Sequence, residues 1–267
     1  MAASVKKSGR ISAYPISNGL RFSIRFTALL SLLLSCINFS TPSGSVCNPI
    51  VVITFDDAHP SIYSIAFPAM RSMDTAWAAT HFFPVSYMGS PGAMTLAQVK
   101  ELEAVGWETG GHGVTHENLS SVPIDSVRRQ VRGSYEFLVQ NNLCHESFAY
   151  PFGNYSDTVK KIVGDYFKNI RAAHDYEYLD GVNREELGYY AVKSGCTADD
   201  IIGRVEKAKS LGAPLVIIGF HAIQPDTAPP LPVYWCKESA FMEFLRYLKK
   251  SELPVMTLRE AVRVLCE

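Results

Sequence analysis

The side chains best suited to catalysis lie in three short clusters, each directly after an apolar run. They are Asp56 with Asp57, His112 with His116, and His221. In parallel α/β folds the carboxyl ends of strands meet at one edge of the sheet and carry the active site. If these apolar runs are strands, we expect the three clusters to converge there.

Two histidines four residues apart can form part of a metal site. On a helical turn the side chains of His112 and His116 would share one face and could bind one ion. This spacing alone is weak evidence, because it is common on solvated helices. The neighbouring Asp56 and Asp57 strengthen it, since two carboxylates at one strand end need a cation or a shared proton to coexist. One Asp with the two histidines would leave coordination positions open for water. Zn²⁺ is the expected ion, and the donor set also admits Co²⁺ or another divalent ion.

The elements that must position these residues alternate along the chain. Strands are expected at 50–55, 78–83, 107–110, 148–150, near 170, at 215–220 and at 254–256. Helix N-caps are expected at Thr95, Ser156, Thr197 and Thr257, and a further amphipathic helix runs through 124–138. Strand–helix alternation implies parallel strands with helical crossovers. About seven such units predict a distorted (β/α) barrel of seven parallel strands rather than a doubly wound sheet.

The first 46 residues differ from the rest. Residues 1–55 contain five basic and no acidic side chains, so the remainder carries a formal charge of −6. A short apolar stretch, 26–37, follows this basic start, which is typical of a secretory signal and too short for a spanning helix. Leu33–Cys36 resembles a lipoprotein processing box, Ser43–Ser45 suits ordinary cleavage, and the long basic region also admits an uncleaved anchor.

We therefore expect two parts: 1–46, a signal peptide or lipoprotein or membrane anchor with a flexible linker, and 47–267, a catalytic domain. The protein is expected to be exported: secreted, periplasmic or anchored to the outer face of the membrane. No basic patch indicates nucleic acid. Cys47, Cys144, Cys196, Cys236 and Cys266 lack C-x-x-C spacing, so a cysteine zinc site is not expected. In an oxidising compartment disulfides are expected, with Cys47 and Cys266 as the predicted pair.

The clusters also occur as longer motifs. Thr54–Asp57, His112–His116 and Phe148–Gly153, in this order and spacing, resemble the motifs of the polysaccharide deacetylase family, the carbohydrate esterases with a NodB-homology domain. Residues 79–83 and 218–221 resemble the second strand and the last histidine motif of that family. The resemblance covers about residues 47–267.

The resemblance implies a role for each residue. Asp57, His112 and His116 would bind the metal, Asp56 would be the general base, and His221 would protonate the leaving amine. The backbone after the third motif, with Tyr150 as the usual contributor, would help to bind the developing oxyanion. This division is chemically sensible, because amide hydrolysis needs a proton delivered to nitrogen and histidine is the natural donor near pH 7.

Three departures from the family pattern bear on these roles. Ala58 stands where the family usually has Gly. The third motif of the family commonly begins with Arg, and here Ala149 stands at that position. The resulting Phe-Ala-Tyr-Pro-Phe-Gly motif resembles a subgroup of the family that also lacks this Arg. Arg171 is our candidate to orient Asp56 instead, and the alternative is a surface charge at a strand end. The usual Asp-plus-Trp fourth motif is missing, and Asp175 is a candidate partner for His221.

The predicted function is metal-dependent removal of N-acetyl groups from N-acetylglucosamine-type units of a surface or extracellular polysaccharide. Trp235, in a proline-rich loop, is the best candidate to stack on a sugar ring. Three alternatives stay open: hydrolysis of another amide, formyl or O-acetyl group on the same scaffold, an inactive carbohydrate-binding relative, and a purely structural metal. Retention of all five polar residues argues against the second. An open three-ligand site next to a spare carboxylate fits the third poorly.

Overall fold

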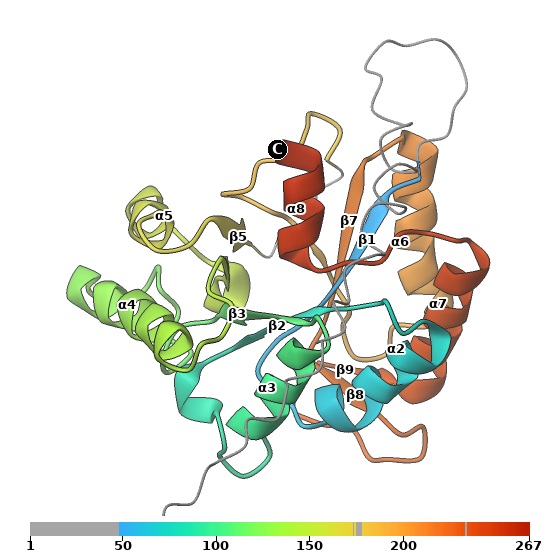
Figure 1. Ribbon diagram of the computed structural model, residues 1–267, viewed down its shortest axis with the longest axis horizontal. Helices are drawn as coiled ribbons and strands as arrows, with labels where there is room; N and C mark the ends of the chain where they lie inside the picture. Colours follow the sequence, from blue (N-terminus) through green and yellow to red (C-terminus); the bar gives the residue numbers. More distant parts are fainter. Residues whose placement is uncertain (1–47, 173, 175–177, 233) are drawn as a thin grey trace, which may run out of the picture. The chain divides into compact units, whose positions relative to one another are not determined.

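Seven parallel strands form the main sheet (Figure 1). In the order in which they lie side by side they are β5 (Asn169–Arg171), β4 (Ser147–Ala149), β3 (Glu108–Gly111), β2 (Thr80–Phe83), β1 (Ile50–Phe55), β7 (Leu215–Phe220) and β6 (Tyr190–Ala191). The sheet curls, and the segment leading into β6 meets β5 through a parallel bridge between Arg171 and Leu187. The predicted fold class, a distorted barrel of seven parallel strands, is confirmed. This computed structural model describes residues 48–172, 174, 178–232 and 234–267, so the predicted signal or anchor segment and Cys47 lie outside it.

Helices connect the strands. They are η2 (Ile62–Ala66), α2 (Phe67–Met73), η3 (Val85–Tyr87), α3 (Leu96–Ala104), α4 (Ile124–Gln140), η4 (Pro151–Gly153), α5 (Asp157–Gly164), α6 (Ala198–Leu211), α7 (Glu238–Lys250) and α8 (Leu258–Cys266). Two short parallel strands, β8 (Ala222–Gln224) and β9 (Trp235–Lys237), form a separate ribbon. In the described part of the chain, no helix combines the length and the apolar character needed to cross a bilayer.

The predicted helix starts are confirmed. The hydroxyls of Thr95, Ser156, Thr197 and Thr257 each accept a hydrogen bond from the backbone N–H three residues further on. The predicted strand at 254–256 is wrong: Val255 makes only an isolated bridge with Val51. The seventh strand is instead β6, whose two residues pair with β7.

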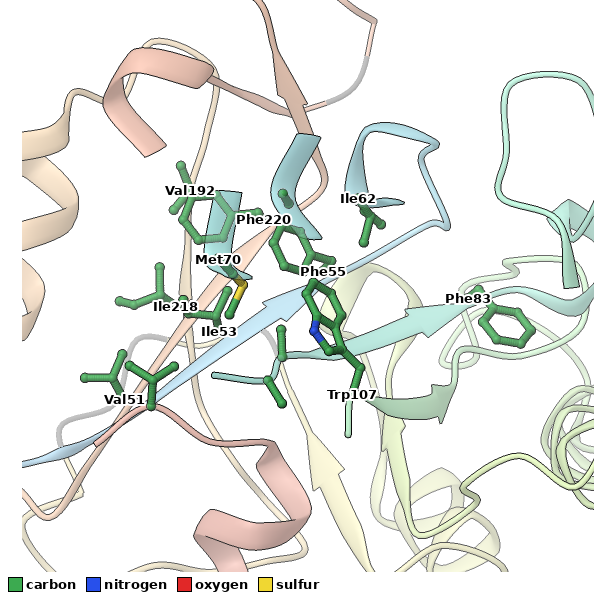
Figure 2. Packing of buried hydrophobic residues seen from close by; sticks show 14 of the residues in the cluster. Val51, Ile53, Phe55, Ile62, Met70, Phe83, Trp107, Val192, Ile218 and Phe220 are labelled. Carbon is green, nitrogen blue, oxygen red and sulfur yellow. The ribbon is translucent and has the colours of Figure 1, made fainter. Parts of the chain in front are cut away.

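The side chains of β1 alternate between two hydrophobic clusters, as the period of a strand requires. Val51, Ile53 and Phe55 belong to the outer cluster under the helices, where the Phe55 ring stacks on Trp107 and on Phe220 (Figure 2). Ile50 and Val52 belong to the inner cluster, inside the curled sheet. Helix α8 contributes to this inner cluster and contacts both β1 and β5, so it closes the amino-terminal end of the barrel.

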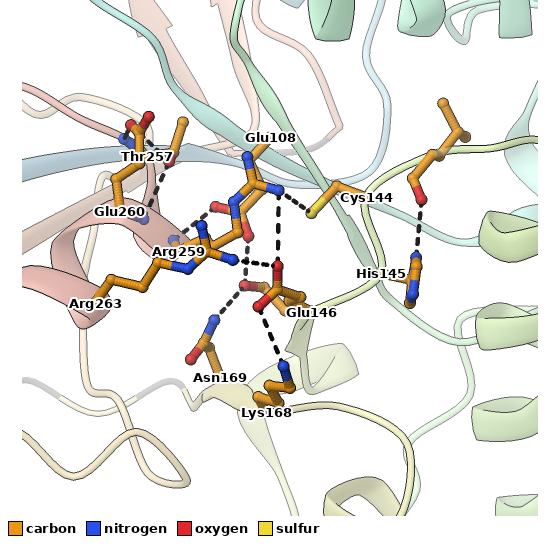
Figure 3. Close-up of polar contacts among 12 residues, drawn as sticks. Glu108, Cys144, His145, Glu146, Lys168, Asn169, Thr257, Arg259, Glu260 and Arg263 are labelled. Carbon is orange, nitrogen blue, oxygen red and sulfur yellow. Dashed lines mark hydrogen bonds and ion pairs between the residues drawn. The ribbon is translucent and has the colours of Figure 1, made fainter. Parts of the chain in front are cut away.

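A buried polar layer lies inside the barrel at the starts of the strands. The Glu108 carboxylate accepts hydrogen bonds from the Thr80 hydroxyl at 2.8 Å, from the Arg259 backbone N–H at 2.8 Å and from the Ser147 hydroxyl. The Asn169 side-chain N–H donates to the same Ser147 hydroxyl at 3.2 Å (Figure 3). Strands β2 to β5 are thereby joined to the first turn of α8.

Glu108 should make the stability of the fold pH-dependent. Burial raises the pKa of its carboxyl above the ordinary 4.5, although Ser147, Thr80 and Arg259 oppose this. A carboxyl whose pKa is raised by folding stabilises the folded state below the unfolded pKa, and this contribution is lost as pH rises through the folded pKa. We therefore compare the free energies of unfolding of the parent and of Glu108→Gln. The advantage of the parent over the variant is expected to fall as pH rises from about 4 towards neutrality. Urea titrations of both metal-free proteins measure it, and a constant difference would contradict the expectation.

Candidate active site

The carboxyl ends of the strands surround a cavity of about 1020 Å³. Its walls include six of the predicted site residues: Asp56, Asp57, His112, His116, Tyr150 and His221. They come from the ends of β1, β3, β4 and β7, elements far apart in the sequence. The structure therefore brings together the clusters that the sequence placed after separate strands.

Asp56 and Asp57 reach the same cavity because the backbone turns between them. Asp56 continues the inward-facing series of Ile50 and Val52 and is 3% exposed. Asp57 would face outward in a continued strand, but its φ of 66° lies outside the strand region and turns the backbone. Ala58 follows with φ 56°, a left-handed conformation that favours glycine. The glycine usual in the family at this position therefore has a geometric reason, and here an alanine adopts that conformation.

Asp57, His112 and His116 form a compact set of candidate metal donors, with one donor atom from each lying within 4.8 Å of the others. Asp57 Oδ1 is 3.3 Å from His116 Nε2 and 3.7 Å from His112 Nε2. In the described part of the chain Asp57 Oδ1 is buried and accepts no hydrogen bond. The Nδ1 of His112 lies 2.7 Å from the Ala149 carbonyl oxygen, so it is the protonated nitrogen and Nε2 keeps its lone pair.

The protonation energetics fit a cation among these three residues. Burial lowers the pKa of His112 to about 3, so its imidazole stays neutral, and burial also lowers the pKa of His116. Burial and the adjacent Asp56 charge raise the pKa of Asp57 to about 6. A divalent ion binds neutral imidazoles and ionised carboxylates, and here, among the described side chains, the negative charge of Asp57 has no positive partner to balance it.

The predicted helical turn at 112–116 is wrong, because these residues form a loop. Gln130 of α4 holds the loop: its side-chain oxygen accepts hydrogen bonds from the backbone N–H groups of Val114 at 2.7 Å and Thr115 at 2.9 Å. His116 then adopts φ 57°, and its ring centroid lies 4.9 Å from that of His112. The two histidines meet through loop geometry and not through helical periodicity.

Arg171 is not a surface charge but a buried partner of Asp56. Its Nη2 lies 2.7 Å from both carboxylate oxygens, and the side chain is 2% exposed. The guanidinium carbon lies 3.7 Å from the Tyr189 ring centroid and 5.0 Å from that of Phe82. Burial by itself raises the pKa of Asp56, but Arg171, with His221 and His112, outweighs it and the net pKa is lowered. Asp56 is thus kept ionised and oriented.

Tyr189 needs a small neighbour on β7 to pack in this way. A Cβ atom on Gly219 would lie 2.4 Å from the Tyr189 ring. That distance is shorter than any van der Waals contact, so a side chain here would displace the ring from Arg171. Gly219 thus indirectly supports the position of Asp56.

His221 is a second neighbour of Asp56. Its Nε2 is 3.9 Å from Asp56 Oδ2, and its ring packs edge-on against Tyr234 at 5.4 Å. Among the described groups, none is hydrogen-bonded to the buried Nδ1 of His221. The predicted partner Asp175 lies outside the described residues. His221 is therefore placed to exchange a proton at Nε2, on the cavity side.

Tyr150 lies in the cavity wall, stacked on Tyr155 at 4.6 Å. Its backbone N–H donates to the Arg171 carbonyl oxygen at 3.1 Å, continuing the pairing of β4 with β5. This N–H is therefore not free for an oxyanion, contrary to the sequence-based expectation. The buried Tyr150 hydroxyl makes no hydrogen bond within the described structure.

The predicted stacking residue Trp235 is not among the described residues that line the cavity; the adjacent Tyr234 is. The sequence interpretation also missed Tyr87, Phe152 and Lys193, which lie in the cavity walls. Phe152 is 60% exposed with φ 59°, and its ring lies 4.6 Å from His116. The aromatic residue near the end of the third motif was the sequence signal that could have identified Phe152.

Solved structures share this architecture. A carbohydrate esterase family 4 pseudoenzyme from Bacillus anthracis is 18% identical, with a TM-score of 0.58 over 84% of this chain and 70% of that one. A family 4 carbohydrate esterase from Streptomyces lividans, in complex with acetate, is 16% identical with a TM-score of 0.56, over 78% and 92% of the two chains. A mutant peptidoglycan deacetylase from Bacillus subtilis is 14% identical with a TM-score of 0.55, over 83% and 93%. At these identities the likeness shows the fold alone.

Sequence comparison gives the family. The comparison with curated proteins found no significant match. Residues 43–167 match the family model for polysaccharide deacetylases, and this stretch contains the first three motifs and all three metal donors. Together with the barrel and the converging motifs, this match supports placing the chain in the polysaccharide deacetylase family of hydrolases.

Proposed function

We propose that this protein is a metal-dependent N-deacetylase that releases acetate from N-acetylglucosamine-type units of a surface or extracellular polysaccharide. The observation that carries the proposal is the Asp57, His112 and His116 donor set beside an ionised Asp56 held by Arg171. A binding protein has no need for a buried carboxylate that is kept charged next to a metal site. The B. anthracis structure is described as a pseudoenzyme, so activity must be measured and not taken from the fold.

Each residue has a defined task in this proposal. Asp57, His112 and His116 would hold a divalent ion, with Zn²⁺ the expected one. When bound, the metal supplies Lewis acidity, which polarises the amide carbonyl and makes water more acidic. Asp56 accepts the proton of the attacking water as general base, and Arg171 keeps it oriented. His221 donates a proton from Nε2 to the amine nitrogen as the C–N bond breaks, so that acetate and a free amine leave.

Loss of metal should abolish this activity. Acetate release from chitin oligomers, peptidoglycan fragments and poly-N-acetylglucosamine is expected to stop after chelation and to return with Zn²⁺ or Co²⁺. The same panel with O-acetylated and N-formylated sugars separates N-deacetylation from the other hydrolyses. Full turnover in metal-free protein would rule out the mechanism. Metal binding without turnover on any substrate would favour an inactive relative.

We further propose that the protein is exported, as the basic and apolar start of the sequence predicts. A polymeric substrate at the cell surface would then lie in the same compartment. Attachment to the membrane through the N-terminus, as a lipoprotein or anchor, remains part of this proposal. Fractionation of cells that express the full chain, with Cys36→Ser as the comparison, measures both features.

A further inference from the structure

Lys193 lies in the cavity wall on the side of His221. It follows the end of β6 by two residues, and β6 pairs in parallel with β7, which His221 directly follows. The Ser194 hydroxyl accepts a hydrogen bond from the Trp235 backbone N–H at 3.4 Å, and Ala222 N–H donates to the Tyr234 carbonyl oxygen at 3.2 Å. The segments that carry Lys193, His221 and Tyr234 therefore form one continuous wall.

The charge of Lys193 is not neutralised by the described protein. It is the only lysine or arginine among the described residues that line the cavity. Of the two described carboxylates that line the cavity, Asp56 is already paired with Arg171, and Asp57 belongs to the donor set with His112 and His116. The Lys193 side chain is exposed, and it makes no ion pair with a carboxylate in the described part of the chain. A lone cation on the wall of a binding cavity attracts an anionic ligand group.

The proposed reaction determines which part of the substrate faces this wall. His221 donates its proton to the amine nitrogen, and that nitrogen belongs to the sugar. The acetyl carbonyl must face the Asp57, His112 and His116 donors. The sugar and its neighbours in the polymer therefore lie against the wall that holds Lys193 and Tyr234. Tyr234 is 46% exposed and offers a ring face or edge to the same sugars.

We propose that Lys193 is a specificity-determining residue that recognises an anionic substituent, a carboxylate or a phosphate, on the reacting sugar or on its neighbour. This inference rests on the proposed deacetylase function and gives its substrate class: an acidic N-acetylated polysaccharide. The contact is made at an exposed position, so it alters the choice among substrates more than the rate of the chemical step.

Matched substrates that differ only in charge test this inference on the zinc-loaded full chain. One pair is an oligosaccharide of alternating N-acetylglucosamine and glucuronic acid with its carboxyl-reduced counterpart. A second pair is an N-acetylglucosamine oligomer with and without a 6-O-phosphate. The parent is expected to prefer the anionic member of at least one pair by about three- to fivefold in kcat/KM at low salt, and less at high salt. The pair that shows the preference identifies the anion.

Lys193→Met should reduce that preference to about one by raising KM for the anionic substrate, and Lys193→Arg should keep it. Lys100→Met, an exposed lysine of α3 outside the cavity, is the matched control and should not change it. Equal kcat/KM for both members of each pair in the parent, or an unchanged preference in Lys193→Met, would overturn the inference while the deacetylase proposal stands. If no substrate is turned over, the deacetylase proposal fails, and calorimetric Kd values for the same pairs and variants then decide the role of Lys193.

Discussion

Replacing His112 by alanine is expected to abolish both zinc binding and turnover. His112 is 2% exposed, its Nδ1–H is fixed by the Ala149 carbonyl, and its Nε2 faces Asp57. Without it, Asp57 and His116 remain as the only described ligands, and two ligands do not hold the ion tightly. Changes to groups that merely orient a ligand cost about 10- to 100-fold in metal affinity, so losing a ligand should cost more than about 100-fold. Zinc titration with a competing chromophoric chelator measures this loss.

The matched control for His112→Ala is His145→Ala. His145 precedes β4 at the opposite end of the strand from Ala149, where it contacts Tyr135. That variant should bind zinc and release acetate like the parent. Thermal unfolding of the metal-free proteins checks that His112→Ala still folds. Parent-like zinc affinity in a folded His112→Ala protein would exclude His112 as a ligand.

Replacing Asp56 by asparagine is expected to leave the metal bound but to slow turnover by about 10²- to 10⁴-fold, the usual cost of a missing general base. An amide is isosteric with the carboxylate but does not accept a proton near neutral pH. Asp56 is not part of the compact donor set, so cobalt-substituted Asp56→Asn should keep the parent absorption spectrum. Single-turnover acetate release, compared at saturating metal, measures the chemical step.

The adjacent Asp57→Asn is the natural comparison, because it should show the opposite pattern: weaker metal binding and an altered cobalt spectrum. Asp56→Asn also leaves the buried charge of Arg171 without its partner. Breaking one side of a buried ion pair costs about 3–5 kcal/mol, so both variants need a measured free energy of unfolding. Near-normal rates in Asp56→Asn, or parent-like metal affinity in Asp57→Asn, would refute this division of roles.

The sequence predicted the barrel and the convergence of the site because both depend on short-range patterns. Buried β-branched runs indicate strands, and a polar residue after each run lies at the same edge of a parallel sheet. The helix caps were equally local: Thr95, Thr197 and Thr257 each bond within one turn. Helix α7 was missed although Ala240, Phe241, Phe244 and Leu248 form an apolar stripe with helical period.

Other features depend on contacts between distant segments, which no local pattern encodes. The two residues of β6 are strand only because they pair with β7, and Val255 has the composition of a strand but lacks a full partner. The loop that brings His112 and His116 together is shaped by Gln130, on a helix that follows it. The burial of Arg171 between two aromatic rings likewise required the fold.

The position of β1 in the sheet has a consequence for how the chain folds. β1 is the first strand in the sequence, yet it pairs with β2 on one side and with β7 on the other. During folding its second edge stays unpaired until β7, more than 150 residues further along the chain, has docked. The sequence of β1, IVVITF, is mostly apolar and β-branched, and the folded protein buries it along its whole length. An unpaired edge of such a strand tends to associate with other chains. Folding is therefore expected to be slow, since pairing across such a sequence distance carries a large loop-closure cost.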